Sequence, residues 1–158
     1  MSVQSAGILL FRFKNRKLEV MLVHPGGPFW ANRDEGAWSI PKGLIDENET
    51  ALDAAKREFK EETGFEVEGA FIELGELKQP SKKTVHVWAF EKDIDETQIV
   101  SNTFELEWPK NSENINEYPE IDKGVWFGLA QARIKILKGQ AGFIDRLVER
   151  IGYVSDDE

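Results

Sequence analysis

Residues 50–64 constrain the fold of this chain more than any other segment, because they predict a helix with opposite chemistry on its two faces. The apolar positions recur at intervals of three and four residues, at Leu52, Ala55 and Phe59. That spacing is typical of a helix face that packs on a core. Thr50 suits the start of such a helix and Gly64 suits the position just after its end. We therefore expect an amphipathic helix over residues 50–63 that lies against other elements.

The opposite face of this helix carries three carboxylates. Glu58, Glu61 and Glu62 stand at positions i, i+3 and i+4, so they project to the same side. Like charges at this spacing repel by about 0.2–0.5 kcal/mol per pair, and Arg57 offsets only part of that cost. Such a face is either simply solvated or a site for a hard cation. Oxygen ligands of this kind suit Mg²⁺ or Mn²⁺.

The residues around these carboxylates follow a fixed spacing. Gly43 is followed after five residues by Glu49, and after seven more by the run Arg57-Glu58-Phe59-Lys60-Glu61-Glu62-Thr63-Gly64-Phe65. This pattern resembles the Nudix box, Gly-x5-Glu-x7-Arg-Glu-U-x-Glu-Glu-x-Gly-U, in which U is a bulky apolar residue. At ordinary residue frequencies, its seven fixed identities would coincide by chance about once in 10⁸ placements.

The resemblance to the Nudix family implies both a fold and a reaction. The fold is a mixed β-sheet sandwiched between α-helices, of the α/β (α+β) class. The reaction is hydrolysis of a nucleoside diphosphate linked to another group, with Mg²⁺ as cofactor and Mn²⁺ as its alternative. By position, the cation ligands would be the carboxylates of Glu58, Glu61 and Glu62, with the backbone carbonyl near Lys42 or Gly43. Arg57 and Glu49 would tie the loop to the helix by an ion pair.

Family members often supply another glutamate from a distant loop, a few residues before a tryptophan that begins a late strand. Glu120 lies six residues ahead of Trp126 and fits this arrangement, and Glu117 is its competitor. We predict that Glu120 is a metal ligand or a base, although both glutamates could instead merely solubilise a polar loop over residues 111–119. The candidate catalytic residues are therefore Arg57, Glu58, Glu61 and Glu120, and the resemblance does not single out the base.

Candidate substrate-binding residues lie on both sides of the box. The segment Trp38-Ser39-Ile40-Pro41-Lys42-Gly43 resembles the one that leads into the box in Nudix enzymes acting on dinucleoside polyphosphates or diphosphoinositol polyphosphates. The lysines that could meet phosphate as point charges are Lys42, Lys82 and Lys83, although Lys82 and Lys83 could instead simply form a solvated turn. The aromatic residues that would either stack on a base or pack in the core are Phe29, Trp30, Trp38 and Trp88.

These residues favour a nucleotide-type small molecule as substrate, with a diadenosine polyphosphate as the leading choice and a nucleoside triphosphate beside it. Pro80 falls fifteen residues after Phe65, where the ADP-ribose-cleaving branch of the family also carries a proline, so ADP-ribose or a nucleotide sugar is an alternative. A nucleotide-binding regulatory module without catalysis is an alternative of another class. Such modules commonly lose box glutamates, and this chain keeps them all.

Composition narrows the function further. The 158 residues carry a formal net charge of −9 and no cysteine, which removes disulfides and thiolate sites and makes nucleic-acid or anionic-membrane binding unfavourable. Residues 43–65 account for −4 of this charge and residues 155–158 for −3. No apolar stretch is long enough for a membrane helix, so a cytoplasmic location is expected. The oligomeric state, monomer or homodimer, is left open.

The rest of the sequence predicts one domain over residues 1–154 with a frayed acidic tail at 155–158. Strands are expected where β-forming residues cluster between turn signals, over residues 3–13, 18–23, 38–40, 71–78, 84–90 and 125–127. A second amphipathic helix is expected over residues 140–151, where Phe143, Leu147 and Ile151 form an apolar stripe.

Overall fold

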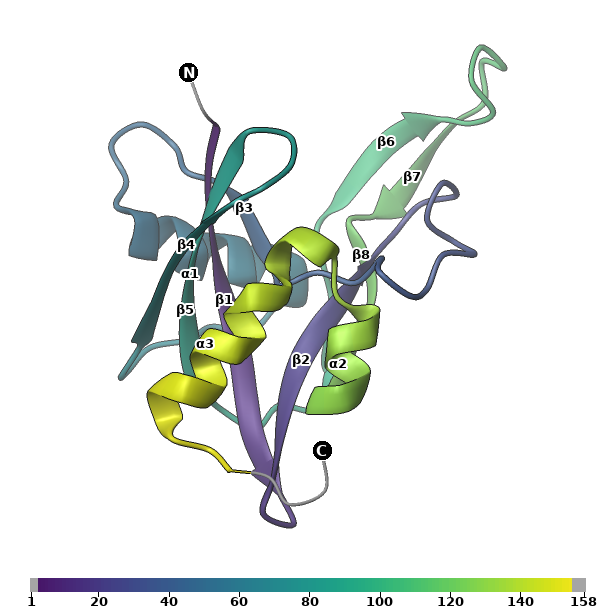
Figure 1. Ribbon diagram of the computed structural model, residues 1–158. Helices are drawn as coiled ribbons and strands as arrows, with labels where there is room; N and C mark the ends of the chain where they lie inside the picture. Colours follow the sequence, from purple (N-terminus) through teal and green to yellow (C-terminus); the bar gives the residue numbers. More distant parts are fainter. Residues whose placement is uncertain (1–2, 155–158) are drawn as a thin grey trace.

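A mixed β-sheet forms the centre of the molecule, as the computed structural model shows for residues 3–154 (Figure 1). The strand order is β4-β5-β1-β2-β8, and β3 pairs with β1. The bounds are β1 Val3–Lys14, β2 Lys17–Pro25, β3 Lys42–Leu44, β4 Ile72–Lys78, β5 Lys83–Glu91 and β8 Ile121–Gly128. β1 runs parallel to β5, and the other pairs are antiparallel. The predicted acidic tail, residues 155–158, lies outside the described residues.

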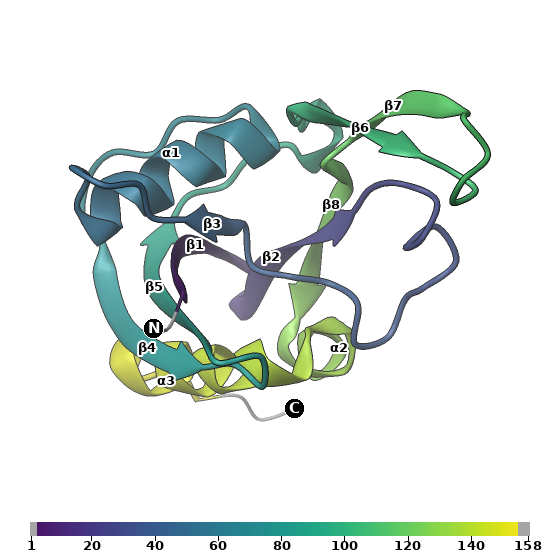
Figure 2. The same ribbon diagram turned by 90° about the horizontal axis from the view of Figure 1, so that it is seen from above.

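Helices cover both faces of this sheet (Figure 2). Alternate residues of β1 point to opposite faces of the sheet, and both faces are apolar. Ile8 and Leu10 are buried in the cluster with α1 (Ala51–Thr63). Leu9 and Phe11 belong to the cluster with the last helices. Those helices are α2 (Leu129–Lys135) and α3 (Ala141–Ile151). The expected sandwich is confirmed. None of the helices in residues 3–154 is long and apolar enough to cross a membrane.

Helix α1 begins and ends where the sequence predicted. The Thr50 hydroxyl accepts a hydrogen bond from the Asp53 backbone N–H at 3.1 Å, which satisfies one free donor of the first turn. Gly64 ends the helix with a φ of 83°, a left-handed conformation that glycine adopts at little cost. The buried side is formed by Ala54, Ala55, Phe59 and Thr63. This packing turns the carboxylate-bearing side of α1 away from the core and towards β3.

Three parts of the chain differ from the expectations. Residues 103–119 form a hairpin of β6 (Thr103–Glu107) and β7 (Ile115–Pro119), so the loop predicted over 111–119 is wrong in its second half. The hairpin projects from the sheet (Figure 1), and most of its side chains face solvent, so the apolar alternation that reveals a strand is weak. Residues 38–40 form only isolated bridges, and α2 was not predicted.

Two short 3₁₀ turns complete the fold. One, η1 (Glu96–Gln98), lies between β5 and the hairpin, and the other, η2 (Lys138–Gln140), immediately precedes α3. Gln140 is 1% exposed, and its side-chain oxygen accepts a hydrogen bond from the Ile40 backbone N–H at 2.9 Å. η2 is thereby fixed to the segment that leads into β3.

Replacing Phe59 by alanine should destabilise the protein by about 3–5 kcal/mol, because this fully buried ring joins α1 to the sheet. Urea unfolding followed by circular dichroism measures the change. The neighbouring exposed position supplies the control, since Lys60→Ala should change stability by about 0.5 kcal/mol or less. Equal effects of the two substitutions would contradict the packing of α1 described above.

Candidate active site

The carboxylate-bearing side of α1 lies directly against β3. Gly43 pairs with Ala6 of β1, and a side chain at Gly43 would overlap the Glu58 carboxyl group. The missing Cβ is therefore what allows this carboxylate to rest against the backbone of β3. The glycine at the start of the box thus has a steric reason, and it brings the β3 backbone and the helix carboxylate together.

Arg57 holds the loop before α1 to the helix. Its Nε and Nη2 donate to the two carboxylate oxygens of Glu49 at 2.9 and 2.7 Å, and Nη2 also donates to the Leu44 carbonyl at 2.9 Å. This is the two-pronged contact that only the planar guanidinium makes. The Arg57 hydrogen bonds, with a further one from the Asp46 backbone, lower the pKa of Glu49 to about 2. The ion pair expected between Arg57 and Glu49 is present.

The remaining nitrogen of Arg57 contacts the helix carboxylates. Nη1 donates to Glu58 at 2.6 Å and to Glu61 at 3.0 Å. One guanidinium therefore offsets charge on three glutamates, and the glutamates farther from it are left without such compensation.

Four carboxylates share the space at the end of α1. The pKa of Glu62 is raised to about 8, chiefly by burial; Lys42 opposes the shift, and the charges of Glu58 and Glu120 add to it. Burial likewise raises the pKa values of Glu58 and Glu120, and the charge of Glu61 adds to both shifts. The structure thus brings Glu120 from the start of β8 to the box, whereas Glu117 is exposed on β7.

These residues fit a hard cation by donor type and by position. All four side chains offer oxygen, and their mutual repulsion is the kind that a bound divalent cation relieves. Within residues 3–154, no three histidine or acidic side chains already stand at cation-binding spacing. Glu58 and Glu61 point to Arg57 instead. A cation would require both to turn partly away from the guanidinium.

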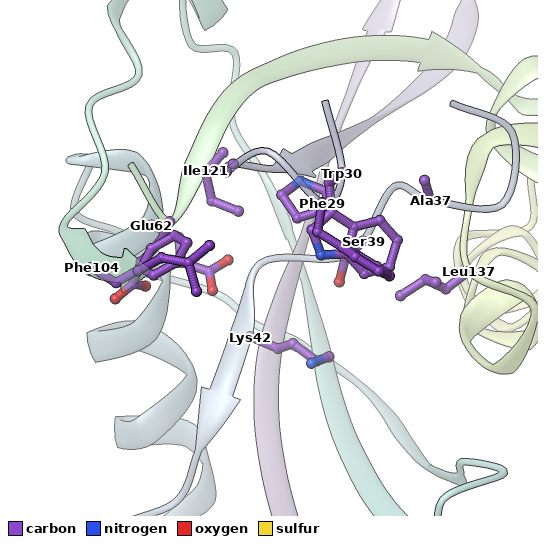
Figure 3. Close-up of a pocket in the computed structure, with 14 residues that line it drawn as sticks. Phe29, Trp30, Ala37, Ser39, Lys42, Glu62, Phe104, Ile121 and Leu137 are labelled. Carbon is purple, nitrogen blue, oxygen red and sulfur yellow. The ribbon is translucent and has the colours of Figure 1, made fainter. Parts of the chain in front are cut away.

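A cavity of about 520 Å³ opens beside these carboxylates (Figure 3). Phe29 and Trp30 form one side of it, and Glu62 and Phe104 lie on the other. The polar side chains lining it include Ser39, Lys42, Glu62 and Glu120. Phe104 and Leu106 of β6 also line it, and sequence reasoning did not identify them. The available signal was the alternation of apolar and polar residues over 103–107, which indicates a strand. It spans too few residues to be distinctive.

The other predicted substrate-binding residues lie elsewhere. Trp38 is 4% exposed, its indole donates to Asp34 at 2.8 Å, and it packs edge-on against Phe127, so the substrate role predicted for Trp38 is replaced by core packing. Trp88 stacks on His86 at 4.3 Å between ring centres and does not line the cavity.

The two lysines of the β4–β5 region also lie outside the cavity. Lys83 lines a second cleft on the other side of Lys42, and Lys82 lies exposed in the β4–β5 turn.

The lowered pKa of Glu49 predicts a pH-dependent contribution to stability. The carboxylate stabilises the fold above its ordinary pKa of 4.5, and this contribution is lost as the pH falls from 4.5 towards 2. Glu49→Gln should therefore be less stable than the wild type at pH 7, and the difference should shrink below pH 4.5 and largely vanish near pH 2. Urea unfolding across this range measures the difference. A constant difference at every pH would contradict an ionic role for Glu49.

Comparison with known proteins gives consistent results. A family model described as NUDIX domain matches residues 1–147. The asymmetrical bis(5'-nucleosyl)-tetraphosphatase of Rattus norvegicus is 32% identical over 108 residues, which are 60% of this chain and 69% of that protein. An RNA pyrophosphohydrolase of Bartonella henselae is 37% identical over 66 residues, 39% of this chain and 35% of that protein.

Solved structures share the fold. A binary complex of a C. elegans Ap4A hydrolase superposes with a TM-score of 0.65 at 21% identity, covering 94% of this chain and 98% of that one. The NUDIX domain of Shewanella oneidensis NrtR, complexed with ADP ribose, gives a TM-score of 0.65 at 17% identity, covering 96% and 89%. The sheet topology, the spacing of the box residues and the family match over residues 1–147 all indicate the same family. The chain belongs to the NUDIX domain family.

Proposed function

We propose that this protein is a divalent-cation-dependent pyrophosphohydrolase that cleaves a phosphoanhydride bond in a nucleoside or dinucleoside polyphosphate, with a diadenosine polyphosphate as the leading substrate. One observation carries the proposal. The box carboxylates and an aromatic-walled cavity open onto the same space, and Glu62, Glu120 and Lys42 line that cavity. Oxygen ligands for a cation therefore stand beside a surface suited to a flat ring.

The cavity suits the base of a nucleotide. Phe29 is 50% exposed, so a large part of its ring remains available to a ligand. Phe104 lies close to the Gly27 backbone, and a side chain on Gly27 would contact its ring at 3.1 Å. Aromatic walls stack on flat rings, and a few polar groups in a mostly apolar cavity fix the orientation of a ligand. A base held here leaves its phosphates near Lys42 and the carboxylates.

The residues present would serve hydrolysis at phosphorus. When bound, Mg²⁺ or Mn²⁺ would neutralise the phosphate charge and activate the attacking water. Glu58, Glu61, Glu62 and Glu120 would hold the cation, and one of these carboxylates would take the proton from the water. Arg57 would keep the loop fixed to α1 through Glu49, while Glu58 and Glu61 turn partly from it towards the cation. Burial of the site would strengthen each of these electrostatic contacts.

The relatives give the substrate choice independent support. The rat protein is named for hydrolysis of a bis(5'-nucleosyl) tetraphosphate, and 69% of its length matches this chain. The Bartonella henselae relative is named an RNA pyrophosphohydrolase, but it matches only residues that make up 39% of this chain. The structure with ADP ribose is similar in fold alone at 17% identity. ADP-ribose or a nucleotide sugar is therefore the second candidate, and a non-catalytic nucleotide-binding module is the third.

Replacing a box carboxylate should abolish most turnover while the fold survives. Glu61→Gln and Glu62→Gln should each lower kcat by about 100-fold or more. Even the loss of a residue that only hydrogen-bonds to a metal ligand typically lowers metal affinity or activity by about 10–100-fold. Glu120→Gln should also lower kcat. The matched control is Glu117→Gln, an exposed glutamate of β7 that should retain wild-type turnover. Circular dichroism of each variant confirms folding. Unchanged turnover in both Glu61→Gln and Glu62→Gln would overturn the site.

A substrate panel separates the candidate functions. With Mg²⁺, diadenosine tetraphosphate should be hydrolysed more efficiently than ADP-ribose or a 5'-triphosphorylated RNA, and EDTA should abolish turnover. Chromatography of the products measures each rate. Exclusive cleavage of ADP-ribose would establish the second candidate. Tight nucleotide binding without hydrolysis of any compound would instead establish the regulatory module.

A further inference from the structure

A second cleft adjoins the candidate active site and carries charge of the opposite sign. Its volume is about 590 Å³, and it lies between β3, the β4–β5 turn and η2. The charged residues that line it are all lysines, namely Lys42, Lys83 and Lys138. No carboxylate of residues 3–154 lines it, although the whole chain carries a net charge of −9. Such a concentration of positive charge in an acidic protein needs an explanation.

None of the three ammonium groups forms an ion pair within residues 3–154, although the charge of Lys42 acts on Glu62. Among residues 3–154, the ion pairs involve other cations, such as Arg12, Lys56 and Arg57, and none involves a lysine of this cleft. Lys42 is half-buried and so partly removed from water without an ion pair, whereas Lys83 and Lys138 are exposed. Like charges gathered in this way repel each other. An anion with several charges would relieve that repulsion.

The walls of the cleft are fixed by hydrogen bonds. Gln79 in the β4–β5 turn donates to the Gly139 carbonyl at 2.8 Å, and a side chain at Gly139 would overlap Gln79. Gln140 accepts from the Ile40 backbone and donates to the Ser39 hydroxyl at 3.1 Å. These contacts hold η2 against both the turn and the segment that leads into β3. The backbone that carries Lys138 is thereby held against the turn that precedes Lys83.

The cleft is continuous with the candidate active site. Lys42 lines both the aromatic cavity and the cleft. Gly43 lines the cleft, and the Glu58 carboxyl rests against that same residue. A substrate would therefore place its base in the cavity and its reacting phosphates at the box. Any phosphates beyond these would lie beside the lysine cleft.

We propose that this lysine cleft binds the phosphates that extend beyond the cleaved anhydride, and that Lys138 is a residue that makes the enzyme prefer substrates with four or more phosphates. The inference rests on the proposed function and deepens it. ADP-ribose has only two phosphates, both of which would occupy the box, so it has no charge to place among the three lysines. A nucleoside tetraphosphate or a dinucleoside tetraphosphate has phosphates left over for the cleft. Each contact between lysine and phosphate is a charge-assisted hydrogen bond.

The test compares the kcat/KM for diadenosine tetraphosphate with that for ADP-ribose in Mg²⁺. Lys138→Ala should lower the ratio of the two values by about tenfold, the size expected for one hydrogen bond between charged groups. Lys138→Arg, which keeps the charge, should largely restore the ratio. The matched control is Lys14→Ala, which removes an exposed lysine at the far end of β1 and should leave both values unchanged. An unchanged ratio in Lys138→Ala would overturn the proposal, because damage to the fold alone would lower both values together.

A binding measurement separates this inference from the proposed function. Calorimetric titration with inorganic tripolyphosphate, at low salt and without divalent cation, requires no turnover. Lys138→Ala should weaken this binding by about tenfold, and Lys14→Ala should not. If the wild type hydrolyses no phosphoanhydride, the proposed function fails, and equal tripolyphosphate binding by wild type and Lys138→Ala would then overturn the cleft as well. Weakened tripolyphosphate binding with an unchanged substrate ratio would show that the cleft holds an anion other than the substrate, which also overturns the proposal.

Discussion

The contact between Arg57 and Glu49 is the interaction on which the arrangement of the site depends. Both side chains come from the box, but Glu49 lies in a loop and Arg57 lies in α1, so their two hydrogen bonds fix the loop relative to the helix. The same guanidinium reaches the Leu44 carbonyl at the end of β3 and the carboxylates of Glu58 and Glu61. A lysine has one charged nitrogen and no planar fork, so it would lose most of this geometry. One side chain therefore connects strand, loop and helix.

The core gives that local arrangement a rigid base. β3 is only three residues long, and it is held in place because Ala6 and Gly7 of β1 pair with it. A side chain at Gly7 would overlap the Pro41 carbonyl, so glycine is required where this segment crosses β1 closely. β1 in turn is buried on both faces, between α1 on one side and α3 on the other. The carboxylates thus stand on the best-packed part of the molecule, and the aromatic wall stands on loop 26–37 and a projecting hairpin.

The parts of the site that the sequence could predict are those fixed by local spacing. Glu58, Glu61 and Glu62 share a helix face whatever surrounds them, and the start and end of α1 are encoded by Thr50 and Gly64. Phe104 and Lys138 could not be found in this way. Each reaches the site only through tertiary packing, one by the hairpin and the other by the hydrogen bonds of η2. Trp38 illustrates the opposite error, because a motif position indicates the backbone path and does not say which way an aromatic ring turns.

The separation of charges explains how one small site can hold both a cation and a polyanion. Lysines placed among the box glutamates would pair with them, as Arg57 does, and neither group would then be free for a ligand. In the structure, β3 divides the two sets. Glu58 and Glu62 lie on the α1 side, and Lys83 and Lys138 lie across it, in the cleft. Lys42 alone acts on both, since it opposes the raised pKa of Glu62 without forming an ion pair with it. The acidic surplus of the chain and its lysine cleft are therefore complementary features, because a phosphate chain chelating a divalent cation presents both charges to the protein at once.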